Sequence, residues 1–134
     1  MSVSEAKKWA LSVREEILQS SSNACVSLFT RIINGTPIDS GHASGNWRTA
    51  PSPPMAEIQR KGKDAAIQEV NSVLSKTYFA NNRLVYFYNN VDYVSGLEYG
   101  NPAYTNPAAP FSAQAPAGMV RINIKDALVS ITPP

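Results

Sequence analysis

The chain opens with an amphipathic segment whose length restricts the kind of domain it can belong to. Ser2 and Glu5 have the S-x-x-E spacing of a capping box, in which each side chain accepts a hydrogen bond from the other residue's backbone N–H. A helix is therefore expected to begin directly after Ser2. Gly35 offers a C-terminal cap and Pro37 prevents continuation, so the sequence predicts one helix over residues 3–34.

Apolar or small side chains recur along this helix, mostly at steps of three or four residues, in two rows. The first row consists of Val3, Ala6, Ala10, Val13, Ile17, Ala24, Leu28 and Ile32. The second row consists of Leu11, Leu18, Cys25, Phe29 and Ile33. The helix is about 45 Å long at 1.5 Å per residue, whereas a compact domain of this chain length is about 35–40 Å across. We therefore expect the helix to extend beyond its own domain or to lie against a neighbouring copy, with a bend or a polar contact at the interrupting stretch 20–23.

A chain of 134 residues, 43% of them hydrophobic and 16% charged, is expected to form a single domain over residues 1–134. Its net charge of +2 is too small to favour nucleic acid or an anionic membrane as the main partner. The one basic cluster, Arg60, Lys61 and Lys63, is interpreted as a solvated turn. The lone Cys25 excludes an internal disulfide and fits a reducing compartment. No stretch has the apolar run of a signal peptide or a membrane span, so we expect a protein that stays in a cytoplasm or is built into a particle there.

Beyond the long helix, helical and β-rich stretches alternate. Helical spacing covers Lys63–Lys76, and strands are expected at Leu84–Tyr88 and Met55–Arg60. Tyr93–Tyr99 has the pattern of one or two helical turns closed by Gly100. The sequence thus predicts an α+β fold, in which the long helix and shorter helices pack on a small, mainly antiparallel sheet.

The C-terminal third of the α+β body, which is expected to span about residues 36–132, is less regular. Residues 101–115 hold prolines and no periodicity, so a loop is expected, of the kind that is functional or ordered by a partner. Residues 119–131 fit both the alternation of a strand and one face of a helix. Pro116, as a first-turn residue, favours the helix.

Candidate catalytic side chains are few. Asp39, Ser40 and His42 are residue types of a hydrolase, but they lie within four positions of one turn, too close together to form a relay, and cap or turn roles explain them equally. Glu98 is a general-base candidate, although an interface ion pair or a hydrogen bond at a helix end is favoured. No metal-ligand or phosphate-loop spacing is present, so we expect no cofactor, no metal and no enzyme activity.

Three stretches, taken in order, resemble a known family. They are Thr36–Trp47 (TPIDSGHASGNW), Tyr88–Gly100 (YNNVDYVSGLEYG) and Gln114–Val120 (QAPAGMV). This order is similar to the HK97 gp10-like family of neck and tail-completion proteins of tailed bacteriophages. In that family a T-P-V-D-T-G stretch leads to a Trp, an aromatic strand leads into N-N-x-x-Y-x-x-x-L-E-Y-G, and Q-A-P-x-G-M follows.

The resemblance implies structural rather than catalytic roles for the matching residues. The turn after the long helix would be fixed by Asp39, Gly41 and Trp47. The corner after the aromatic strand would be formed by Tyr93, Leu97, Glu98, Tyr99 and Gly100. The terminal helix would be started by Ala115, Pro116, Gly118 and Met119. The chain departs from the family at His42, where many relatives carry a strongly basic residue, and in a long apolar loop at residues 101–112.

The function that the resemblance implies is that of a virion protein at the joint between the DNA-filled head and the tail. It would assemble in the host bacterial cytoplasm as a homo-oligomeric ring of roughly six or twelve copies. Its partners would be other neck and tail proteins (an adaptor or stopper, the tail terminator, the tail tube), with DNA contact at most incidental in the channel and no membrane. Three alternatives stay open: a tail terminator that caps the tail tube, a small hydrolase, and a DNA-binding module.

Overall fold

The computed structural model describes residues 2–38, 41–52, 55–82, 84–99 and 118–131, and it begins with helix α1 (Val3–Gly35). Both bonds of the capping box are present, from the Ser2 N–H to Glu5 Oε2 (2.8 Å) and from the Glu5 N–H to Ser2 Oγ (3.1 Å). The predicted glycine cap at the other end is wrong. Gly35 is the last helical residue, and Thr36 ends the helix in an extended conformation. The Thr36 hydroxyl donates to the Ile32 carbonyl (2.8 Å), which satisfies one of the last carbonyls without a left-handed glycine.

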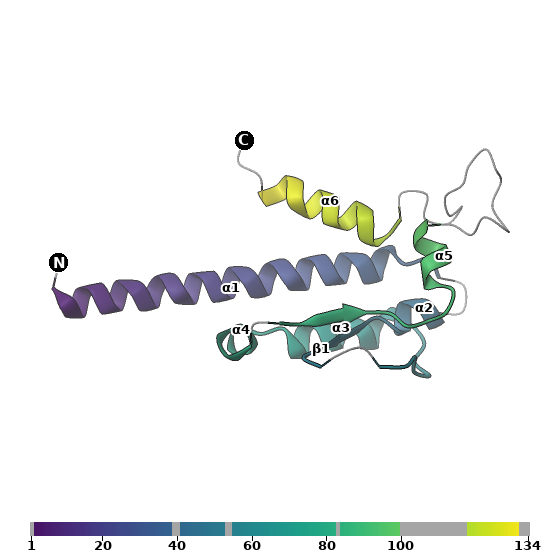
Figure 1. The fold of residues 1–134 in the computed structure, drawn as a ribbon, viewed down its shortest axis with the longest axis horizontal. Coiled ribbons are helices and arrows are strands. Elements are labelled where there is room, and N and C mark those ends of the chain that lie inside the picture. The colour runs from purple at the N-terminus through teal and green to yellow at the C-terminus, as the bar shows by residue number, and fades with distance from the viewer. Residues whose placement is uncertain (1, 39–40, 53–54, 83, 100–117, 132–134) are drawn as a thin grey trace.

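Within the described residues, seven further elements follow α1 (Figure 1). They are α2 (His42–Gly45), β1 (Arg48–Ala50), α3 (Lys63–Val73), α4 (Lys76–Asn81), β2 (Tyr86–Tyr88), α5 (Val94–Tyr99) and α6 (Val120–Ile131). Strands β1 and β2 pair antiparallel, with Thr49 opposite Phe87. The predicted α+β class is confirmed, and the described sheet has two strands.

Helix α1 forms the middle layer of the body, with α6 on one side and the sheet, α3 and α4 on the other (Figure 1). The main core lies between α1 and the sheet and α3. Its buried side chains are Phe29, Ile32, Ile33, Trp47, Ala66, Val70, Leu74 and Met119. The Phe87 ring stacks on both Phe29 (4.1 Å between centroids) and Trp47 (4.7 Å), so the aromatic strand is joined directly to α1.

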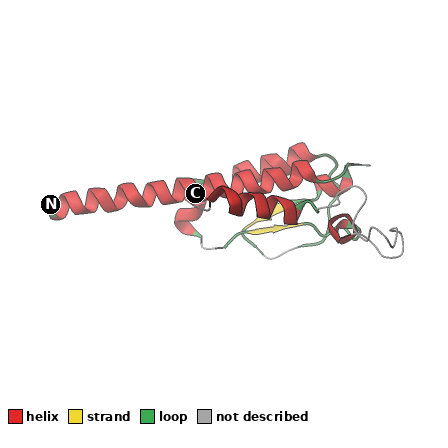
Figure 2. Cartoon of the chain, turned by 90° about the horizontal axis from the view of Figure 1, so that it is seen from above, coloured by secondary structure: helices red, strands yellow, loops and turns green. Residues whose placement is uncertain are grey.

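The N-terminal half of α1 projects beyond every other element, as its length predicts (Figures 1 and 2). Side chains of residues 2–20 are exposed except for half-buried Val13 and Leu18. The polar contact expected within residues 20–23 is Ser22, whose buried hydroxyl donates to the Leu74 carbonyl (3.2 Å). The body therefore begins to cover the helix near Ser22.

Two predicted elements in the body differ from the structure. Residues 55–60 form no strand, because a side chain takes up their backbone groups: Asn46 accepts from the Ile58 N–H (2.7 Å) and donates to the Arg60 carbonyl (3.4 Å). The helix predicted over 63–76 is divided, since α3 ends at Val73 and Ser75 caps α4. The aromatic strand is shortened to Tyr86–Tyr88, and residues 120–131, which were ambiguous, are a helix.

Candidate functional site

The turn after α1 is built around Gly41 and Trp47, two of the residues singled out by the first motif. Gly41 has φ +81°, and its carbonyl accepts from the Gly62 N–H (2.9 Å). A Cβ on Gly41 would lie 3.0 Å from that nitrogen, so both the backbone conformation and the space require glycine. The buried Trp47 ring donates from Nε1 to Thr36 Oγ1 (2.7 Å), which ties the turn to the end of α1. Asp39 lies outside the described residues.

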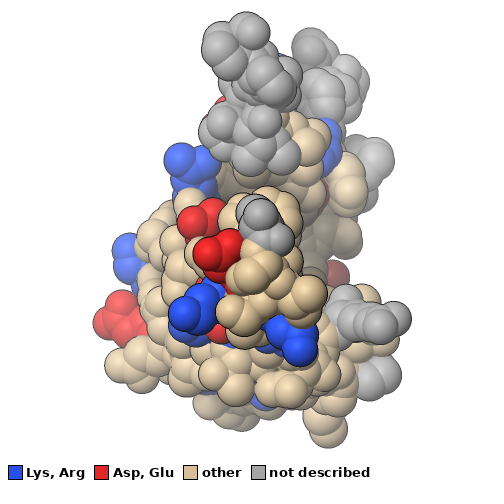
Figure 3. Space-filling view, turned by 90° about the vertical axis from the view of Figure 1, so that its left-hand side faces the viewer, with Lys and Arg blue, Asp and Glu red and all other residues tan. Residues whose placement is uncertain are grey.

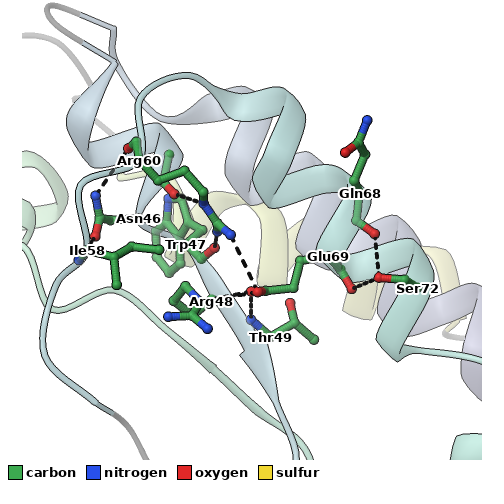
Figure 4. A network of polar contacts seen from close by, with 10 residues as sticks. Asn46, Trp47, Arg48, Thr49, Ile58, Arg60, Gln68, Glu69 and Ser72 are labelled. Carbon is green, nitrogen blue, oxygen red and sulfur yellow. Dashed lines mark hydrogen bonds and ion pairs between the residues drawn. The ribbon is translucent and has the colours of Figure 1, made fainter.

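A network of charged side chains connects this turn to α3 (Figure 4). Arg60 donates to the carbonyls of Gly45 (2.5 Å) and Trp47 (2.7 Å) and pairs with Glu69 (3.4 Å). Glu69 also pairs with Arg48 (3.1 Å). The interpretation of Arg60 as part of a solvated turn is therefore wrong, because its guanidinium is bound by a carboxylate and two carbonyls.

The carboxylate of Glu98 occupies the N-terminus of α6. It is 5% exposed, and its Oε2 accepts from the backbone N–H groups of Met119 (2.7 Å) and Val120 (2.9 Å). Its Oε1 accepts from the backbone N–H of Arg121 (3.0 Å) and from the Arg121 Nε (2.9 Å). Three of the N–H groups that a helix leaves unbonded at its start are thus satisfied by one side chain from α5. This is the helix-end role favoured for Glu98 from the sequence.

The electrostatics of this corner favour an ionised carboxylate. Burial by itself raises the pKa of Glu98, but the hydrogen bonds from Val120, Arg121 and Met119 outweigh it, and the pKa lies below its ordinary value. A general base needs a free lone pair and a pKa near the working pH. Glu98 has neither, so its chemistry here is that of a clamp between α5 and α6.

Gly118 is required by the same clamp. Its φ is +75°, and a Cβ would lie 2.5 Å from Glu98 Oε1. The neighbouring Met119 is buried in the core. Residues 118 and 119, which the third motif assigned to the start of the terminal helix, therefore bring the backbone against the carboxylate. The helix itself begins at Val120, and Pro116, the predicted first-turn residue, lies outside the described residues.

The remaining residues of the second motif divide between core and surface. Leu97 packs against the core. Tyr93 and Tyr99 are exposed, and the Tyr99 ring faces the Arg121 guanidinium at 4.8 Å from its centroid. Gly100 is outside the described residues. The structure therefore brings Glu98 against Gly118 and Met119, and Tyr99 against Arg121, although about 20 positions separate the partners in the sequence.

The hydrolase candidates do not converge on a reacting position among the described residues. His42 Nε2 lies 3.5 Å from Glu57 Oε2, and its Nδ1 lies 3.3 Å from the Asn46 amide. Asp39 and Ser40 are not described. No group of three metal-ligand side chains occurs within the described ranges, and no helix there is long and apolar enough to cross a membrane.

An apolar groove lies between α1 and α6. Its cavity is about 320 Å³ and is lined by Ala24, Cys25, Ser27, Leu28, Arg31, Ile124, Ala127 and Leu128. Ile124 and Leu128 remain 42% and 56% exposed at its edge. Burial raises the pKa of the Cys25 thiol, which lowers its thiolate fraction at neutral pH.

The protruding part of α1 is the second apolar surface, and we refer to residues 3–17 as the α1 overhang. Val3, Trp9, Leu11 and Ile17 are each 60% or more exposed there. Viewed end-on, acidic and basic side chains lie beside one another near the tip, among a larger uncharged area (Figure 3). Sequence reasoning did not single out Trp9, because it belongs to neither apolar row. Trp9 could have been found from the sequence, because it is a large aromatic residue surrounded by charged residues in a helix that is too long for its domain.

Comparison with known proteins adds no relative: no family model, no curated protein and no solved structure matches this chain. The likeness of the three motifs to the phage family therefore rests on the residues quoted for it.

Proposed function

We propose that this chain is a structural protein of a tailed-phage virion, located at the head–tail joint, where copies of it form a ring that joins the tail to the filled head. The observation that carries the proposal is the α1 overhang, which exposes large apolar side chains in an element that the body leaves uncovered. The resemblance of the three motifs suggests which assembly the chain belongs to. The exposed apolar overhang is the physical reason to expect that it assembles at all.

An uncovered amphipathic helix is unfavourable for a protein that works alone. A helix of this length gains most of its stability from packing an apolar face, and exposed apolar patches mark interaction surfaces. The subunits of a ring meet through two different faces, one on each neighbour. The overhang offers the two flanks of one uncovered helix for such contacts, and the groove between α1 and α6 is a further apolar surface on the same chain.

The motif residues support a rigid structural role. Gly41 and Trp47 fix the turn that sets the sheet against α1, and Glu98 and Gly118 fix the start of α6. Both sets determine how the elements are oriented rather than presenting groups to a substrate. A subunit whose faces must match those of its neighbours needs this kind of rigidity.

The test is the mass of the purified protein, alone and together with the neighbouring neck proteins, and its detection in purified virions. We expect a closed oligomer and a stoichiometric virion component. A strictly monomeric protein that is absent from virions would refute the proposal. A virion density map separates this function from that of a tail terminator, which would cap the tail tube itself.

The other two alternatives are tested by activity. Glu98→Gln and His42→Ala would abolish a turnover while leaving particle assembly intact if the chain were a hydrolase. Strong, salt-dependent affinity for DNA would instead support a DNA-binding module. We expect neither result, because Glu98 is held by four donors and Arg48 and Arg60 are both paired with Glu69.

A further inference from the structure

The overhang carries a regular apolar stripe that continues toward the groove. Its members follow alternating steps of three and four residues, the a and d positions of a heptad: Val3, Ala6, Ala10, Val13 and Ile17. Val3 and Ile17 at its two ends are 75% and 60% exposed. The two alanines between them permit close approach of a second helix. We call these five residues the heptad stripe.

The heptad stripe, in which Val13 is half-buried and the other side chains are exposed, lies on the side of α1 away from the contacts with α4 and Leu74. The body contacts α1 through Glu15, which pairs with Lys76 (2.7 Å), and through Ser22, which bonds Leu74. At 100° per residue, both lie on the opposite side of the helix from the stripe. They occupy the f positions of two successive heptads. Further along α1, the stripe side is the one covered by α6, at Ala24 and Leu28. The overhang thus prolongs a helix-packing face past the point where the described residues of its own chain supply a partner.

The charges of the overhang favour a protein partner over a polyanion. Its three basic side chains are balanced by three acidic ones, which gives no net charge: Lys7, Lys8 and Arg14 against Glu5, Glu15 and Glu16. A DNA or anionic-lipid surface would need an excess of Lys and Arg. A balanced face with an apolar stripe is instead typical of a helix that packs against another helix.

The two flanks of the stripe differ, and this difference sets the orientation of the partner. Lys7 and Arg14 occupy the e positions on one flank, and Trp9 and Glu16 occupy the g positions on the other. In a parallel pair the g flank of one helix meets the e flank of the next, which places Trp9 beside Arg14 of a second copy, a cation–π pair. In an antiparallel pair of identical helices, like flanks meet, so Lys7 and Arg14 of the two copies would repel each other.

We propose that the α1 overhang packs along the α1 overhang of a second copy, parallel and in register, through the heptad stripe. This deepens the proposed function and rests on it in one respect: a cyclic ring gives every copy of a helix the same sense along the ring axis, whereas an isolated two-fold dimer does not require this. The occupant of the stripe is therefore the heptad stripe of the neighbouring chain, and around the ring the g flank of each copy meets the e flank of the next.

Disulfide cross-linking of the full-length protein tests the orientation. In a Cys25→Ser background, Val3→Cys and Ile17→Cys each place one thiol at an end of the stripe, and Ser4→Cys places a control thiol on the outer side of the same turn. Parallel, in-register packing brings each stripe thiol next to its own counterpart, within the short Cβ separation that a disulfide needs. We expect each stripe variant, oxidised alone, to form several-fold more covalent dimer than Ser4→Cys.

The outcomes separate the inference from the proposed function. If neither stripe variant cross-links alone but an equal mixture of the two does, the packing is antiparallel and the inference is overturned. If the protein forms a ring in which neither variant exceeds the Ser4→Cys control, the overhang is not the interface, while the proposed function stands. Efficient cross-linking of both stripe variants in a protein absent from virions supports the inference and contradicts the proposed function.

Discussion

The two halves of α1 obey the same helical pattern but have opposite surroundings. Phe29, Ile32 and Ile33 in the C-terminal half are buried against the sheet and α3, whereas Trp9 and Ile17 in the N-terminal half are exposed. The C-terminal half is therefore stabilised by tertiary packing, and the N-terminal half by its cap and its internal hydrogen bonds. From this comparison we expect one continuous helix to contain two units of stability, of which only the C-terminal one unfolds together with the body.

The two tryptophans give the largest expected contrast between these regions. Trp47 is 5% exposed, stacked on Phe87 and bonded to Thr36, so Trp47→Ala is expected to lower the free energy of unfolding by about 3–5 kcal/mol. Trp9 is 63% exposed, so Trp9→Ala is expected to change the free energy of unfolding by less than about 0.5 kcal/mol. Urea unfolding of both variants, at concentrations where the protein is monomeric, measures the difference. Equal losses would show that the overhang folds as part of the body.

The features that the sequence predicted well are those with local causes. The start of α1 depends on Ser2 and Glu5, three positions apart, and both hydrogen bonds of the predicted capping box are present. The strand predicted at residues 55–60 was wrong for a long-range reason. Asn46, in a turn more than ten positions earlier, forms hydrogen bonds with the backbone of Ile58 and Arg60. The alternation of apolar and polar residues, from which a strand is predicted, gives no sign of such a contact.

The candidate site shows the same limit. The role of Glu98 as an acceptor at a helix end was predictable from its setting, but the helix it caps begins 22 positions later, and only the fold brings Val120 to it. Trp9 was missed because the two apolar rows explained the helix without it. Its exposure became visible only once the structure showed where the body ends.

Gly118→Ala is expected to cause the next largest loss of stability. Like Trp47→Ala, it should destabilise the body and leave the α1 overhang unchanged. A left-handed conformation costs a residue with a Cβ roughly 1–3 kcal/mol, and here the Cβ would also clash with the Glu98 carboxylate. Gly96→Ala in α5 is the matched control, because its Cβ meets nothing within 4 Å and alanine is the better helix former. Calorimetric melting should show a lowered Tm for Gly118→Ala and an unchanged or raised Tm for Gly96→Ala. A tolerated Gly118→Ala would mean that α6 does not depend on the clamp.

The stability of Glu98→Gln as a function of pH tests whether the charge of Glu98 holds α6 to the body. The pKa of Glu98 is lower in the folded protein than its ordinary value of 4.5, so its contribution to stability is present above about pH 4.5 and is lost as the pH falls through the folded pKa. Hydrogen bonds to a charged group contribute about 1.5–3 kcal/mol, which is the loss expected for Glu98→Gln at pH 7. The gap in unfolding free energy between wild type and variant should narrow as the pH is lowered below 4.5. A gap that stays constant across this range would show that the charge is not what holds α6.

Ser2→Ala is expected to have the smallest effect on global stability and gives the most direct test of the comparison. The Ser2 hydroxyl accepts from the Glu5 N–H at the tip of the overhang, and loss of such a cap costs a helix end about 1 kcal/mol. Because the tip makes no part of the buried core, this cost should appear as local fraying. Amide hydrogen exchange in the monomer should therefore accelerate over the first turns of α1, while exchange at Phe29–Ile33 and the urea midpoint stay unchanged. Slower exchange at the tip in both wild type and variant upon assembly would indicate that a second copy supplies there the packing that the body gives the rest of α1. If Ser2→Ala instead shifted the urea midpoint of the monomer, the two halves of α1 would unfold as one cooperative unit. The exposure of the heptad stripe could then not be explained by the absence of a neighbouring copy.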